Sequence, residues 1–89
     1  MIKETVKIQN KLGLHARAAS SFVNTAQEFI SSVEVLTDQI SANGKSIMNI
    51  LMLQASNDTE IELIVDGEDE TEAMAALLRL INQKFGEEE

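Results

Sequence analysis

The stretch Leu12-Gly13-Leu14-His15-Ala16-Arg17-Ala18-Ala19-Ser20-Ser21-Phe22-Val23 joins a loop to a helix. Apolar residues recur in it at i, i+3, i+4 and i+7, the period of one helix face, namely at Ala19, Phe22, Val23 and Ala26. The chain's single histidine, His15, comes directly before this helix. The N–H groups of a first helical turn lack intrahelical partners and form the positive end of the helix dipole. The stretch therefore predicts a helix over about residues 16–28, with a place for an anion beside His15.

Composition excludes several kinds of protein. The 89 residues are 44% hydrophobic, which predicts one globular domain over residues 1–89. The chain has no cysteine and a single histidine, so a disulfide framework and a thiolate or multi-histidine metal site are excluded. No apolar run approaches the roughly 20 residues of a membrane span, and the N-terminus lacks the layout of a signal peptide. We therefore expect a cytoplasmic protein that does not bind membranes.

Charge is distributed unevenly along the chain. The formal net charge is −8, which argues against a nucleic-acid partner, because phosphate contacts need clustered lysines and arginines. Residues 1–55 carry five basic and four acidic side chains, whereas residues 56–89 carry two basic and eleven acidic ones. The part of the chain around His15 is therefore close to neutral, and its charge does not oppose an anion there.

Periodicity and turn residues predict six further elements. Apolar residues alternate with polar ones in four segments that we expect to be strands, at about residues 2–8, 32–37, 40–42 and 60–66. Asp38-Gln39 fits the turn of a hairpin between the second and third of these. Two helices are predicted as well, a two-turn helix capped by Ser46 and a helix over about residues 70–84 capped by Asp69. Residues 86–89 are expected to be a frayed tail.

The order of these elements, β-α-β-β-α-β-α, indicates the fold class. It predicts an α+β protein in which helices cover one face of a four-stranded, mostly antiparallel sheet. The pattern leaves the strand order open, because a ferredoxin-like arrangement shares the first six elements.

The surroundings of His15 suit phosphoryl chemistry. A neutral imidazole is a nucleophile near neutral pH. If the electrophile is a phosphoryl group, the N–H groups of Ala16 and Arg17 and the Arg17 guanidinium can hold its oxygens. Ordinary interpretations compete with this one. A histidine at a helix start is more often a surface or capping residue, and Ser46 is more often a simple N-cap.

The two-turn helix after Ser46 has more apolar side chains than it can bury. Ile50 and Leu53 already supply a core-facing pair. We therefore expect some of Ile47, Met48 and Leu51 to be exposed, and an exposed apolar cluster of this kind indicates a docking surface.

Two motifs together resemble a known family. Leu12-Gly13-Leu14-His15-Ala16-Arg17 and Asn43-Gly44-Lys45-Ser46-Ile47-Met48, at this separation, are similar to HPr, the phosphocarrier of the bacterial phosphotransferase system, over about residues 2–85. The resemblance implies an open-faced β-sandwich with strand order 1-4-2-3 and three helices on one face. It implies that Nδ1 of His15 accepts phosphate from phosphorylated Enzyme I and passes it to a histidine of a sugar-specific IIA domain, with Arg17 stabilising the phosphate.

The resemblance also implies regulation and a partner surface. Ser46 matches the serine that the HPr kinase/phosphorylase phosphorylates, and transcriptional regulators are a further class of implied partner. The partner surface around His15 would consist of Ser20, Asn24, Ile47, Met48 and Leu51. We expect a monomer without cofactor or metal, a carrier rather than a turnover enzyme.

The chain departs from the family pattern at a few positions. The family usually has proline where this chain has Ala18, and lysines where it has Asn24 and Gln27. Proline is well tolerated in a first helical turn, so we expect Ala18 to loosen the site slightly without abolishing its function. Fewer positive charges near the site should slow encounter with an acidic partner.

Three alternatives stay open at this point. The chain could be a regulatory module that signals through Ser46 alone, or a phosphocarrier of the nitrogen-regulatory branch. It could also be a small ferredoxin-like binding domain with an incidental histidine, for which the strand order would be 4-1-3-2.

Overall fold

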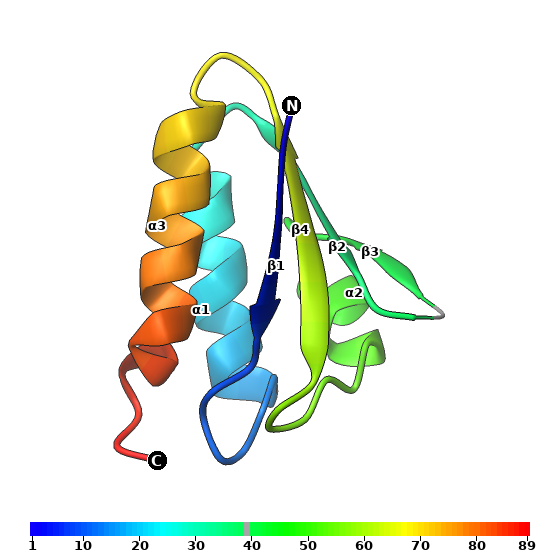
Figure 1. Cartoon of the computed structure of the whole chain (residues 1–89), viewed down its shortest axis with the longest axis vertical. Helices are drawn as coiled ribbons and strands as arrows, with labels where there is room; N and C mark the ends of the chain where they lie inside the picture. Colours follow the sequence, from blue (N-terminus) through cyan, green and yellow to red (C-terminus); the bar gives the residue numbers. More distant parts are fainter. Residues whose placement is uncertain (39) are drawn as a thin grey trace.

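The computed structural model describes residues 1–38 and 40–89, and Figure 1 shows how its elements are arranged. Each predicted element is present, with ends that differ from the prediction by two residues at most, apart from the hairpin turn at Asp38-Gln39, which lies partly outside the described residues. In chain order the elements are β1 (Ile2–Lys7), α1 (Ala16–Gln27), β2 (Ser32–Leu36), β3 (Ser41–Asn43), α2 (Ile47–Met52), β4 (Glu60–Asp66), α3 (Glu70–Asn82) and a 3₁₀ turn (Lys84–Gly86).

The four strands form one antiparallel sheet in the order β1-β4-β2-β3. β4 is central, with Ile61 opposite Val6 of β1 and Leu63 opposite Val35 of β2. This order confirms the expected 1-4-2-3 arrangement. It also excludes the ferredoxin-like order 4-1-3-2, and with it the third alternative.

The core lies between one face of the sheet and the helices. Apolar and polar residues alternate along β4, and the apolar ones, Ile61, Leu63 and Val65, are buried. The predicted apolar face of α1 is buried as well, at Ala19, Phe22, Val23 and Ala26. α1 and α3 run side by side along the sheet, and α2 packs against α1 (Figure 1). Within the described residues, no helix has the length and apolar character needed to cross a membrane.

The start of α3 differs from the prediction. Asp69 stands at the N-cap position, but among the described residues its carboxylate caps no N–H group of its own helix. It accepts hydrogen bonds from the backbone N–H groups of Ile30 and Ser31, each at 3.0 Å, and from the Ser31 hydroxyl at 2.5 Å. The Ser31 hydroxyl and these N–H groups lower the pKa of the Asp69 carboxyl. Asp69 therefore ties α3 to the loop after α1, because that loop brings three donors to it.

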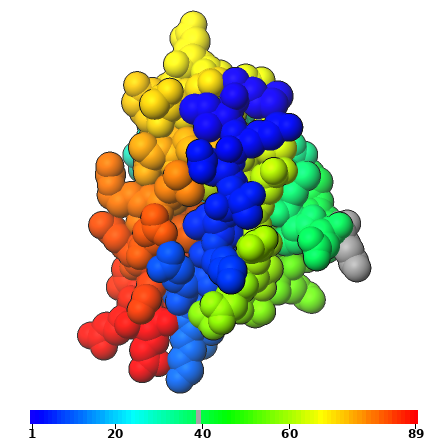
Figure 2. Space-filling model, in the orientation of Figure 1, coloured from blue at the N-terminus to red at the C-terminus, as the bar shows by residue number. Residues whose placement is uncertain are grey.

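The two ends of the chain lie at opposite ends of the molecule (Figure 1). The N-terminal amine donates to both carboxylate oxygens of Glu70 at 2.9 Å, which fastens β1 to the start of α3. At the other end, the C-terminal residues lie against the loop that precedes α1, red against blue in Figure 2. This second junction contains the candidate site.

Candidate functional site

The loop before α1 is positioned by a close backbone contact at Gly13. Gly13 has φ +70°, and a Cβ atom there would lie 2.5 Å from the carbonyl oxygen of Ala55 and 2.8 Å from Cα of Ser56. The next N–H group, that of Leu14, donates to the same Ala55 oxygen at 2.8 Å. Only glycine combines this conformation with this approach. The contact fixes where α1 begins, and so where His15 stands.

His15 is the N-cap residue of α1. Its backbone is extended (φ −74°, ψ 178°), and its carbonyl oxygen accepts the first helical bond from Ala19 at 2.8 Å. Among the described residues its imidazole makes no capping bond to the helix, and the side chain is 26% exposed. Ala16 and Arg17 follow in the first turn, and both are exposed. The imidazole therefore stands beside the free N–H groups of the first turn but forms no hydrogen bond with them.

A carboxylate from the C-terminus, which sequence analysis did not identify, faces the imidazole. Nε2 of His15 contacts Oε2 of Glu87, and the other oxygen, Oε1, accepts from Nδ2 of the fully buried Asn10 at 2.9 Å. Burial alone would raise the pKa of the Glu87 carboxyl, but the hydrogen bonds with Asn10 and His15 outweigh burial and lower that pKa. The Arg17 charge acts in the same direction.

The C-terminal tail, residues 87–89, is turned toward the site by an unusual backbone. Lys84, Phe85 and Gly86 have φ values of 58°, 56° and 81°, and only one of the three is glycine. Phe85 anchors the turn because its side chain is buried in the core. Beyond the turn, the Lys11 N–H donates to the Glu89 carbonyl, and the two side chains form an exposed ion pair at 3.5 Å. The tail therefore packs against the loop before α1 instead of fraying.

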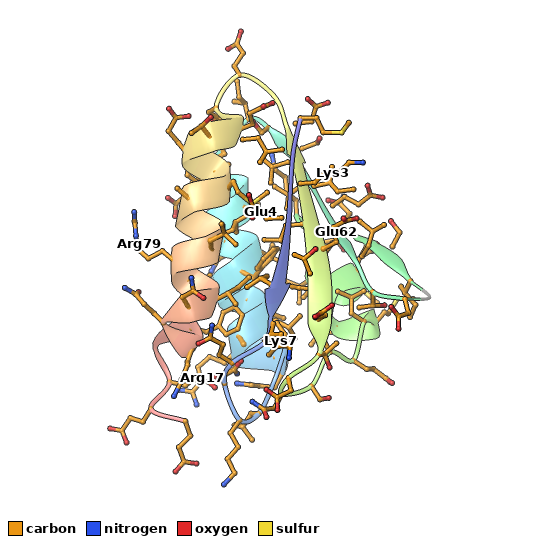
Figure 3. The ribbon with its side chains drawn as sticks, viewed as in Figure 1. Lys3, Glu4, Lys7, Arg17, Glu62 and Arg79 are labelled. Atoms are coloured by element: carbon orange, nitrogen blue, oxygen red, sulfur yellow. The ribbon has the colours of Figure 1, made fainter. Side chains whose placement is uncertain are left out.

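A cleft of about 490 Å³ lies between this tail and the start of α1. It is lined by Lys11, Leu12, Arg17 and residues 86–89. Figure 3 shows Arg17 at the end of the molecule where the acidic side chains of the tail project. The cleft thus contains two cations, Lys11 and Arg17, and the three glutamates of the tail. The sequence places this acidic segment far from His15, but the fold brings Glu87 into contact with the imidazole, so the surroundings of His15 are more acidic than expected.

Ser46 is the N-cap of α2, as its ordinary interpretation predicted. Its hydroxyl oxygen accepts from the Asn49 backbone N–H at 3.3 Å and from the Asn49 Nδ2 at 3.0 Å. Ser46 does not lie beside His15. Lys45, the residue before Ser46, contacts the end of α1. Its carbonyl accepts from the Gln27 side chain at 3.2 Å, and its Nζ donates to the Phe29 carbonyl at 2.7 Å.

α1 and α2 therefore run in opposite directions. The residues before α2 touch the end of α1, while Ala55, after α2, touches Leu14 at the start of α1. His15 and Ser46 are thus separated by about the length of α1, roughly 18 Å for its 12 residues. The structure does not bring the two predicted sites together.

An apolar surface of α2 occupies the space between them. Ile50 and Leu53 are buried as predicted, whereas the remaining apolar side chains are exposed, namely Ile47 (40%), Met48 (75%), Leu51 (37%) and Met52 (63%). We call these four residues the α2 patch. Met52 is an addition to the predicted set. On α1, Asn24 is exposed and Ser20 is half-buried.

The residues around His15 suit one kind of ligand and not another. Across the described residues, no group of three or more histidine, cysteine, aspartate or glutamate side chains could hold a metal ion. The site offers a nucleophilic imidazole, a cation two residues later and the N–H groups of a helix start. Such a set can bind a phosphoryl group and stabilise its charge.

Comparisons with known proteins agree with this description. The family model for the PTS HPr component phosphorylation site matches residues 2–83. The phosphocarrier protein HPr of Neisseria meningitidis serogroup A is 54% identical over the whole of both chains. Among solved structures, HPr-C-His from Thermoanaerobacter tengcongensis is 47% identical, covers both chains fully and superposes with a TM-score of 0.96. An HPr dimer from the same organism, also 47% identical, covers 98% of this chain and 100% of its own, with a TM-score of 0.79.

Proposed function

This chain belongs to the HPr family, the phosphocarriers of the phosphotransferase system, and we propose that Nδ1 of its His15 accepts a phosphoryl group from phosphorylated Enzyme I. The carrier then passes the group to a histidine of a sugar-specific IIA domain. The observation that carries this proposal is the position of His15, an N-cap residue whose imidazole is accessible at 26% of its surface and stands beside the free N–H groups of the first turn of α1.

The local groups supply what phosphoryl transfer needs. The lone pair of Nδ1 attacks phosphorus, the bond between phosphorus and the donor atom breaks, and a new bond joins phosphorus to Nδ1. The N–H groups of Ala16 and Arg17 and the Arg17 guanidinium then neutralise the phosphoryl oxygens. Positioning and charge stabilisation account for most of the catalysis of such transfers. Because the phosphate leaves only to a second partner, the chain acts as a carrier and not as a turnover enzyme.

The α2 patch supports docking by both partners. It presents four apolar side chains on the helix beside α1, and exposed apolar clusters of this kind commonly form protein interfaces. Enzyme I and the IIA domain would dock here in turn, with Ser20 and Asn24 of α1 at the edge of the contact. Both would then reach the same His15.

Phosphorylation of Ser46 by the HPr kinase/phosphorylase would act on docking. A phosphate adds about −1.5 to −2 charges, and the N-terminus of a helix tolerates them well. Since Ser46 lies about one α1 length from His15 but next to Ile47 and Met48, the added charge would repel an acidic partner without touching the imidazole. We expect Ser46→Asp to raise the KM of Enzyme I for this chain as phosphoryl acceptor. The kcat and the backbone NMR spectrum should stay close to those of the wild type.

A matched control for this substitution is Thr71→Asp, which places the same charge on the exposed first turn of α3. It should leave the KM unchanged. A global rearrangement of the Ser46→Asp spectrum, or an equal effect of Thr71→Asp, would contradict the docking explanation.

The carrier role itself is tested with purified components. Incubation with phosphoenolpyruvate and the cognate Enzyme I should place an acid-labile phosphate on the chain, and His15→Ala should abolish it. Addition of a IIA domain should then remove that phosphate. A regulatory module would accept phosphate at Ser46 but not at His15, and a nitrogen-branch carrier would load His15 but transfer nothing to sugar-specific IIA domains.

A further inference from the structure

The contact between Glu87 and His15 assigns the imidazole protons. An ionised carboxylate can only accept hydrogen bonds, so the Nε2 atom that faces it must carry the proton. In the neutral ring the lone pair is then left on Nδ1. Which nitrogen of a histidine is free is commonly set by the hydrogen bond that the other nitrogen makes.

We propose that Glu87 is a positioning residue for phosphoryl transfer: it holds the Nε2–H tautomer of His15 and so presents the Nδ1 lone pair to the phosphoryl donor. This inference rests on the proposed function, because it explains how one ring nitrogen becomes the acceptor. A carboxylate beside a histidine performs the same service in catalytic triads, where it fixes the tautomer and the orientation of the ring.

Asn10 makes this carboxylate a built part of the site. Most surface carboxylates are mobile and contribute little. The Asn10 side chain is fully buried, and its Nδ2 donates both to Oε1 of Glu87 at 2.9 Å and to the Gly13 carbonyl at 2.8 Å. Its Oδ1 has no hydrogen-bond partner among the described residues. Asn10 thus uses both of its N–H groups, one of them on Glu87, while its own acceptor stays unpaired.

The backbone before Glu87 supports the same conclusion. Lys84 and Phe85 adopt the left-handed conformation although neither is glycine. Such residues cost free energy and persist where the surrounding structure holds them, often at functional sites. Here the buried Phe85 holds the turn, and the turn aims Glu87 at the ring.

The charge of Glu87 also suits the reaction step. When the Nδ1 lone pair forms the bond to phosphorus and the bond from phosphorus to the donor breaks, the proton stays on Nε2. The ring, neutral before attack, then carries a positive charge. The carboxylate at Nε2–H stabilises that charge from the side of the ring opposite the phosphoryl group. It therefore assists transfer without competing for the Nδ1 position.

Removal of the Glu87 carboxylate changes the rate of phosphate acceptance in opposite directions, depending on whether Glu87 positions the ring or only blocks the cleft. If the tail only blocked the cleft, removal of the Glu87 carboxylate would speed phosphate acceptance. If Glu87 holds the tautomer, removal slows it. Glutamine is a demanding substitute, because its amide has one acceptor oxygen to offer to two donors, Nε2–H of His15 and Nδ2 of Asn10.

The test combines nitrogen NMR with kinetics on the full chain. Two-bond ¹H–¹⁵N spectra of the ring, recorded at a pH where it is neutral, report the tautomer, and His15 is the single histidine, so its signals are unambiguous. The variants are Glu87→Gln and Glu87→Ala. The control is Glu28→Gln, which removes an exposed carboxylate at the opposite end of α1. Phosphate acceptance is then measured with phosphoenolpyruvate and Enzyme I.

We expect the wild type and Glu28→Gln to show a protonated Nε2 and a free Nδ1. Both Glu87 variants should move toward the averaged signals of two exchanging tautomers, with a severalfold lower kcat/KM for phosphate acceptance, because the reactive tautomer no longer dominates. Unchanged ring signals in both variants, or faster acceptance, would overturn the proposal. If the wild type accepts no phosphate, the carrier role fails, while the NMR comparison, which needs no donor, still decides whether Glu87 holds the tautomer.

Discussion

Gly13→Ala tests whether the backbone contact at residue 13 positions the site. Alanine in the left-handed conformation costs about 1–2 kcal/mol relative to glycine. Its Cβ would also lie 2.5 Å from the Ala55 oxygen, a backbone atom that cannot swing aside, so the loops must separate. Separation weakens the bond from the Leu14 N–H to that oxygen, a further loss of about 0.5–1.5 kcal/mol. We therefore expect a total destabilisation of roughly 1.5–3.5 kcal/mol.

Thermal and urea unfolding, followed by circular dichroism, measure this loss. At about 4–8 °C per kcal/mol for a domain of this size, the midpoint should fall by on the order of 10–20 °C. Gly86→Ala is the control, because Gly86 also has positive φ (+81°) but an added Cβ would meet no described atom within 4 Å. It should show the conformational cost alone. If Gly13→Ala destabilises the protein no more than Gly86→Ala, the close contact with Ala55 does not position the loop.

Four further measurements follow from the structure. Ala18→Pro restores the usual family residue in the first turn of α1 and should stabilise the fold by about 0.4–1 kcal/mol, which calorimetry would detect as a rise in Tm. Asp69→Asn should lower the free energy of unfolding at pH 7. Because the hydrogen bond from Ser31 lowers the pKa of Asp69 from its ordinary 3.8, the difference in free energy between wild type and variant should have its full size above pH 3.8. It should disappear as the pH falls through the lowered pKa of the folded protein. Met48→Ser should raise the KM for Enzyme I with little change in kcat, whereas an unchanged KM would exclude this exposed side chain from docking. Light scattering after gel filtration should show a monomer, although a solved relative is a dimer; a stable dimer would contradict our expectation.

Local sequence patterns predicted most of the fold. Alternation in β4 and helical spacing in α1 identify the buried faces, because each period of the pattern matches one kind of element. Ser46 also behaves as its residue type suggests. The strand order could not be derived in this way, because several arrangements of the same elements bury the same faces. It came from the resemblance, and the sheet confirms it.

The contacts that the sequence did not predict are long-range ones. Glu87 reaches His15 because Lys84 and Phe85 take a conformation that their residue types disfavour, and no local pattern signals that turn. Three glutamates after a glycine are typical of a solvated tail, so the composition of this segment did not predict the contact between Glu87 and His15. Asp69 differs from its prediction for the same reason, since the loop at Ile30 and Ser31, distant in the sequence, brings three donors to its carboxylate.

The most direct test of the central claim is the identity of the nitrogen that bears the phosphate. ¹⁵N-labelled protein, loaded from phosphoenolpyruvate through Enzyme I, gives ring spectra in which coupling to phosphorus marks one nitrogen. We predict phosphorus on Nδ1 of His15, with the proton retained on Nε2 beside Glu87. Phosphorus on Nε2, or on no nitrogen of His15, would contradict the account.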